Sequence, residues 1–77
     1  MPSFKRMHLL EKCSVSIAGH RTSVALEAEF WAILRQMAHA DGVSLPKLIA
    51  RVDAERGARP LASALRLLAL AAVQSRS

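Results

Sequence analysis

Residues 20–34, HRTSVALEAEFWAIL, constrain the fold more than any other part of the chain. The first half alternates in steps of two, which is typical of a β-strand, and the second half places apolar residues at helical spacing. The period changes within a few residues, with no Gly or Pro at the change. A strand needs a hydrogen-bonding partner, and a chain of 77 residues offers few candidates. The position of that partner is therefore the first question that the sequence raises.

The small size of the chain limits how it can be stabilised. A single domain of 77 residues buries little surface, so it needs a disulfide, a metal or a second subunit. Cys13 is the single cysteine, which excludes an intrachain disulfide and fits a reducing cytoplasm, and the three histidines lie at no zinc-binding spacing. With 52% hydrophobic residues, the chain carries more apolar surface than one subunit can hide. We therefore expect the chain to form an oligomer.

The charge of the chain indicates an anionic partner. The net charge is +5 and the isoelectric point about 10.8, which favours nucleic acid first and an acidic membrane surface second. The C-terminal run LASALRLLALAAV is too short to span a bilayer, which takes about 20 residues, and we expect no secretory signal. No set of side chains suggests a catalytic centre, so we expect neither an enzyme nor a cofactor nor a bound metal.

The first 20 residues of the chain show two different patterns. Residues 1–13 show no clean period and predict a flexible arm, followed by one domain over residues 14–77. The stretch SVSIA, residues 14–18, alternates again and is separated from the next strand by Gly19 and His20. Either a tight hairpin or a single strand with a glycine bulge fits this pattern.

The strand over residues 20–26 has two distinct faces. Thr22, Val24 and Leu26 share the face that suits a core. The opposite face is small and polar and begins with an arginine, which suits a surface that touches a ligand; it carries Arg21, Ser23 and Ala25.

Two helices follow, over residues 28–39 and residues 45–56. Gly42 ends the first, because glycine readily takes the left-handed conformation at a helix C-terminus. Ser44 is a suitable N-cap for the second, and Pro46 is tolerated in its first turn.

A third helix is predicted over residues 61–74, after the break at Pro60. Apolar residues occur on almost every face of this helix, so we expect it to be buried on more than one side.

The order of strand, helix, glycine turn and serine-capped helix resembles the ribbon-helix-helix DNA-binding family. The resemblance begins at Arg21, and the block SVSIAGHRTSVALEAEFW, residues 14–31, is similar to one in a subfamily of small bacterial members. It implies a mainly α fold with one short strand, which pairs antiparallel with its copy from a second subunit in an intertwined homodimer. The third helix goes beyond the family's usual two.

The resemblance also implies a function and a set of DNA contacts. The family lays its ribbon in the major groove of double-stranded DNA, where the outward side chains Arg21, Ser23 and Ala25 would touch base edges. Alanine at the third position departs from the usual polar pattern. The expected activity is that of a transcriptional repressor that binds short, roughly palindromic sites.

The resemblance also implies which residues contact phosphates and which form the dimer core. Phosphate contacts are expected at the start of the second helix, where free N–H groups attract anions, and from two nearby side chains; the positions are Val43, Ser44, Leu45, Lys47 and His20. The dimer core is expected to consist of Val24, Leu26, Phe30, Trp31, Leu34, Leu48, Ile49 and Val52.

A different class of function stays open at this point. The same dimer fold could serve as a protein interaction module, antitoxin-like or an adaptor, whose apolar third helix docks into a partner's groove. DNA binding would then be secondary or absent.

Overall fold

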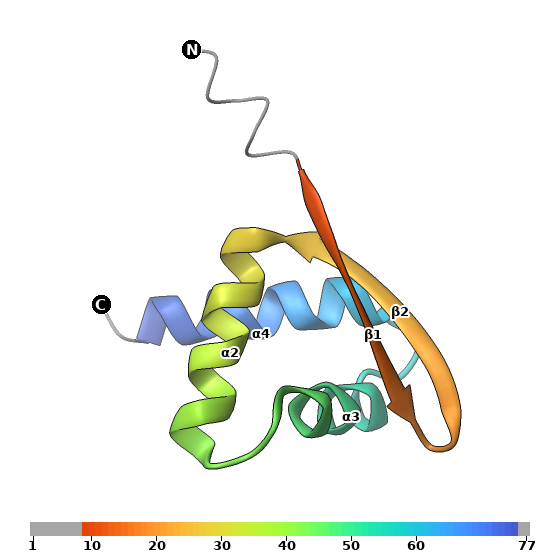
Figure 1. The fold of residues 1–77 in the computed structure, drawn as a ribbon. Helices are drawn as coiled ribbons and strands as arrows, with labels where there is room; N and C mark the ends of the chain where they lie inside the picture. Colours follow the sequence, from red (N-terminus) through yellow and green to blue (C-terminus); the bar gives the residue numbers. More distant parts are fainter. Residues whose placement is uncertain (1–8, 76–77) are drawn as a thin grey trace.

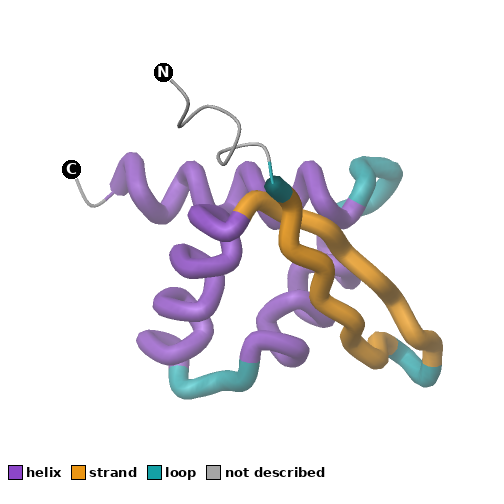
Figure 2. Tube along the Cα trace, turned by 45° about the horizontal axis from the view of Figure 1, so that its top comes forward, coloured by secondary structure: helices purple, strands orange, loops and turns teal. Residues whose placement is uncertain are grey.

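The structure, a computed structural model, describes residues 9–75. Its elements are the strands β1 (Leu10–Ile17) and β2 (His20–Glu27) and the helices α2 (Ala28–Asp41), α3 (Leu45–Glu55) and α4 (Leu61–Ser75). The two strands form an antiparallel hairpin along one side of the helices (Figure 1). β2 runs directly into α2, and the hairpin turn lies at the other end of the sheet (Figure 2). The predicted ribbon followed by two helices and an extra C-terminal helix is confirmed.

The expectation of a single strand needs correction, because one edge of β2 has a partner in its own chain. Pairing of β2 with its copy in a second subunit stays a prediction. β1 pairs with β2 over its whole length, ending with Ile17 opposite His20. The turn between them consists of Ala18 and Gly19, at φ values of 52° and 82°. Positive φ at both positions is what a two-residue type I′ turn requires. Of the two alternatives for residues 14–20, the chain forms the hairpin.

β1 also begins earlier than the sequence indicates. Residues 1–8 of the expected arm lie outside the described residues, but residues 10–13 belong to β1 rather than to an arm. The alternation of Val15 and Ile17 continues backwards to Cys13, which is partly buried opposite Val24. Cysteine behaves as a small apolar residue here, and this extends the inward face of the strand by one position.

The hydrophobic core lies between the inner face of the hairpin and the three helices. Its buried residues are Val15, Ile17, Val24, Leu26, Trp31, Leu34, Ala38, Leu48, Ile49, Leu65 and Ala69. Most of the expected dimer core is therefore buried within one chain, and only Phe30 and Val52 are partly exposed. The reason is α4, whose Leu65 and Ala69 are fully buried and whose contacts reach both α2 and α3.

Two polar interactions fix the hairpin against the helices. The buried indole of Trp31 donates its Nε1–H to the backbone oxygen of Glu11 at 2.8 Å, so α2 holds β1 in place. At the end of β2, Arg66 of α4 makes a two-pronged ion pair with Glu27, with Nε–Oε1 and Nη2–Oε2 distances of 3.0 and 3.3 Å. The Arg66 guanidinium also lies over the Phe30 ring, 5.9 Å from its centroid. Both strands of the ribbon are thus tied to the helical layer.

The connection between α2 and α3 follows the predicted capping. Gly42 takes the left-handed conformation at the end of α2, with φ of 69°. The Ser44 hydroxyl accepts a hydrogen bond from the Lys47 backbone N–H at 3.2 Å, as an N-cap does. These caps fix the direction in which the N-terminus of α3 faces.

Candidate nucleic-acid interface

The outer face of the hairpin is polar, whereas its inner face is buried. Along β2, the structure places Arg21 and Ser23 on the outer face, exposed, and Ala25 there half-buried. On the opposite face of the strand, Val24 and Leu26 point inward and are 5% and 0% exposed. All three expected base-contact positions therefore lie on one surface.

β1 adds a second row to this outer face that the sequence prediction missed. Lys12, Ser14 and Ser16 are all exposed. The strand register places them opposite Ala25, Ser23 and Arg21 respectively, and directly opposite residues share a face. The alternation around Val15 and Ile17 is the sequence signal for this row, and it extends back beyond residue 14 to Cys13.

The two cations on this face have no acidic partner among the residues that the structure describes. Lys12 and Arg21 make no ion pair with any of residues 9–75, whereas Arg51, Arg56 and Arg66 each pair with a carboxylate. Unpaired cations on an exposed surface are available to bind an anionic ligand.

The start of α3 offers fewer free N–H groups than expected. The Val43 N–H donates to the Ala38 carbonyl at 3.0 Å, because it takes part in the C-terminal cap of α2. Pro46 has no N–H, and the Lys47 N–H is used by the Ser44 hydroxyl. The N–H groups of Ser44 and Leu45 have no such bond to residues 9–75, so two amides remain for an anion rather than three.

Two side chains complete the expected phosphate set. Lys47 is exposed in the first turn of α3 and makes no ion pair with residues 9–75. His20 is exposed at the first position of β2, directly after the hairpin turn.

Other kinds of site find no support in the part of the chain that the structure describes. Residues 9–75 contain no group of three or more His, Cys, Asp or Glu side chains that could hold a metal ion. None of the described helices is both long and apolar enough to cross a membrane.

Comparison with known proteins agrees with this architecture. The model of the family described as "Ribbon-helix-helix domain" matches residues 10–73. No curated protein matches the chain. A solved structure that it resembles is that of an uncharacterized protein from Bordetella pertussis Tohama I, with 30% sequence identity and a TM-score of 0.74. The match covers 94% of this chain and 63% of that one, so this chain spans less than two thirds of the relative's length. The chain belongs to the ribbon-helix-helix domain family.

Proposed function

We propose that this protein is a dimeric, sequence-specific DNA-binding protein that represses transcription by occluding a promoter. The observation that carries the proposal is the exposed, polar outer face of the hairpin, whose two cations make no ion pair within residues 9–75, above a buried inner face. A two-stranded ribbon fits the major groove of B-DNA, so its outer side chains can reach base edges. Membership of the family supports the same function.

The residues of the outer face have distinct chemical roles in this proposal. Arg21 can donate two hydrogen bonds to guanine O6 and N7, which makes it the main sequence-reading group. Ser23 can pair with several bases and is less selective, and Ala25 offers only a methyl contact to thymine.

Phosphate binding would hold the ribbon in register. The free amides of Ser44 and Leu45 and the ammonium group of Lys47 form a local positive site at the α3 N-terminus. His20 would add a contact beside the hairpin turn. Contacts of this kind position a protein on the duplex without reading the sequence.

Replacing Arg21 with alanine should weaken binding to the selected DNA site by about 10- to 100-fold, because a bidentate contact to guanine contributes about 1–3 kcal/mol of discrimination. The site comes from selection of genomic fragments by the purified protein at near-physiological salt, and affinity is then measured by fluorescence anisotropy. The matched control is Arg35→Ala, which removes one exposed, unpaired cation from α2. Equal losses for the two variants would contradict base reading by Arg21.

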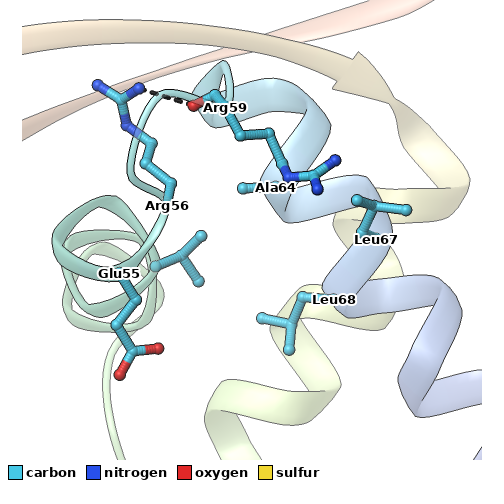
Figure 3. Close-up of a pocket in the computed structure, with 7 residues that line it drawn as sticks. Glu55, Arg56, Arg59, Ala64, Leu67 and Leu68 are labelled. Carbon is cyan, nitrogen blue, oxygen red and sulfur yellow. Dashed lines mark hydrogen bonds between the residues drawn. The ribbon is translucent and has the colours of Figure 1, made fainter.

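The dimer interface is proposed at α4, where apolar surface remains exposed. Leu67 and Leu70 are 45% and 47% exposed, and Arg66, the one charged residue of α4, is paired with Glu27. Beside them, α3 and α4 enclose a groove of about 480 Å³ (Figure 3). Its lining residues are Val52, Glu55, Arg56, Arg59, Ala64, Leu67 and Leu68.

Charge complementarity supports a second copy of the chain as the occupant of this groove. Glu55 and Arg59 line it, and neither makes an ion pair with residues 9–75. A two-fold axis makes every contact reciprocal, so a contact between the Glu55 of one copy and the Arg59 of the other would form twice. Two copies of the chain repel each other overall, because each has a net charge of +5. The outer side of α4 carries no unpaired charge, so it adds nothing to this repulsion.

Replacing Leu67 with glutamate should convert the dimer to a monomer, because the new carboxylate would have to be buried twice across the two-fold axis. Multi-angle light scattering after size exclusion measures the mass, and circular dichroism verifies the fold. The control Ala32→Glu adds the same charge at an exposed position of α2 and should remain dimeric. A Leu67→Glu protein that stays dimeric would place the interface elsewhere.

The second candidate function is a protein interaction module that uses the same groove. The observation in its favour is the exposed apolar ridge of Leu67 and Leu70 beside the groove. Under this alternative, Arg21→Ala would leave capture of the protein partner intact, and no DNA sequence would be enriched by the selection.

A further inference from the structure

The hairpin places a second row of polar side chains beside the proposed reading strand β2, on the same outer surface. Three exposed side chains of β1 each lie opposite an outward residue of β2. They are Lys12, Ser14 and Ser16, opposite Ala25, Ser23 and Arg21 respectively. Neighbouring strands of a sheet lie about 4.8 Å apart, so a ligand that covers the outer face of β2 is also within reach of β1.

Pairing within the chain fixes the position of β1 in the sheet. β1 occupies one edge of β2 along all eight of its residues, and the other edge of β2 has no strand partner within residues 9–75. A second strand of a DNA-reading ribbon, which we predict to be the copy of β2 from another subunit, can therefore pair only with that other edge. β1 then lies on the outside of the ribbon. The buried side chains of Val15 and Ile17 and the bond from Trp31 to the Glu11 carbonyl hold it there.

The dimensions of B-DNA place such an outer strand over the phosphates. The major groove is about 12 Å wide, so its walls stand about 6 Å from its centre line. The axis of a strand that flanks a two-stranded ribbon lies one and a half strand spacings from the centre of the ribbon, or about 7 Å. Side chains on the outer face of β1 therefore meet the sugar–phosphate backbone rather than the base edges.

The chemistry of the β1 row suits phosphate. The ammonium group of lysine is a compact point charge, which binds phosphate without the planar fork that arginine presents to guanine. Lys12 is exposed and makes no ion pair with any of residues 9–75, so its charge is available. The hydroxyl groups of Ser14 and Ser16 can donate hydrogen bonds to phosphate oxygens.

We propose that β1 is a phosphate-binding strand, in which Lys12, with Ser14 and Ser16, binds the DNA backbone along the border of the groove that β2 reads. This inference rests on the proposed DNA binding and assigns a backbone contact on the sheet, in addition to the one at the start of α3. In a dimer, the two copies of β1 would lie along the two walls of the groove. Lys12 thus increases affinity without adding to the preference among sequences.

The first test removes the charge of Lys12. Lys12→Ala should lower affinity for the selected site and for an unrelated duplex by the same factor and leave the selected sequence unchanged. The loss should be about tenfold smaller at 200 mM than at 50 mM salt, because the variant lacks one phosphate contact in each of two chains. Lys12→Arg keeps the charge and should bind like the parent. The matched control Arg35→Ala, which removes an exposed cation of α2, should change neither affinity nor its salt dependence.

Two results of this test would overturn the inference. If Lys12→Ala relaxed the selected sequence, Lys12 would read a base rather than bind the backbone. If Lys12→Ala bound DNA like Arg35→Ala, β1 would lie away from the DNA. Lys12 would then serve only to protect the edge of the sheet from further pairing, as lysines on edge strands do.

The second test adds a charge to the same row, because a gain of affinity cannot come from a damaged fold. Ser14→Lys should raise affinity for the selected site and for the unrelated duplex, and by more at 50 mM than at 200 mM salt. The control Ala32→Lys adds the same charge at an exposed position of α2 and should raise affinity less. Equal gains for the two variants would contradict a phosphate contact at β1.

The parent protein separates failure of this inference from failure of the proposed function. If the parent enriches no sequence, DNA reading itself is absent, and both proposals fall. If the parent enriches a sequence while the Lys12 and Ser14 variants behave like their controls, only the assignment of β1 falls.

Discussion

Replacing Trp31 with alanine should remove much of the stability of the chain. Trp31 is fully buried, and truncation of a buried aromatic residue to alanine costs about 3–5 kcal/mol. A domain of this size has a total unfolding free energy of about 4–12 kcal/mol. The change also removes the hydrogen bond that holds the Glu11 carbonyl, so the hairpin should loosen along with the core. The midpoint of thermal unfolding, followed by circular dichroism, should fall by more than about 12 °C.

The variant Trp31→Phe separates the two contributions of the indole. Phenylalanine retains an aromatic ring in the core but has no N–H to donate to Glu11. We expect an intermediate loss, in which the missing hydrogen bond contributes about 1 kcal/mol. An alanine variant as stable as the parent would show that α2 does not hold the hairpin in solution.

The affinity for the selected DNA site should depend steeply on salt. In a dimer, each chain can bring Lys47 and the α3 N-terminus to the backbone and the cation of Arg21 into the groove, which together displace the counterions of about six phosphates. Affinity should then fall on the order of a thousandfold between 50 and 200 mM salt, because each contact releases condensed counterions. Equilibrium anisotropy titrations at several salt concentrations give the slope of log affinity against log salt, which we expect to be about −5.

A lysine substitution shows which contacts produce this slope. Lys47→Ala should reduce its magnitude by about two in a dimer, one unit for each chain, while the preference among DNA sequences stays the same. Arg35→Ala, on the exposed side of α2, is the matched control and should leave the slope unchanged. A slope near zero for the parent would contradict binding to the DNA backbone.

The helical part of the fold could be predicted from residues close together in the sequence. The apolar spacing along α2 and α3, the Ser44 N-cap and the left-handed Gly42 are all local signals, and each acts in the structure as expected. The outward position of Arg21 and Ser23 also followed from the period-two pattern, because alternate side chains of a strand point to opposite faces.

The start of β1 could not be predicted in the same way. The residues Leu10, Glu11 and Lys12 carry no alternation, since both Leu10 and Glu11 are exposed in the strand. What makes them a strand is the ladder with β2 and the indole of Trp31, twenty residues further along the chain than Glu11. The sequence also carried only a weak indication of the turn between β1 and β2, because Ala18 takes a positive φ that alanine seldom adopts.

The sequence by itself thus determined the helices, their caps, the outward face of β2 and the excess of basic charge, because these depend on the order of neighbouring residues. Only the tertiary structure decided which strand pairs with β2, that the Val43 N–H is already used, and that α4 closes the core within one chain. The physical reason is that a backbone group or an apolar face needs a partner, and the sequence specifies the need without specifying which distant segment meets it.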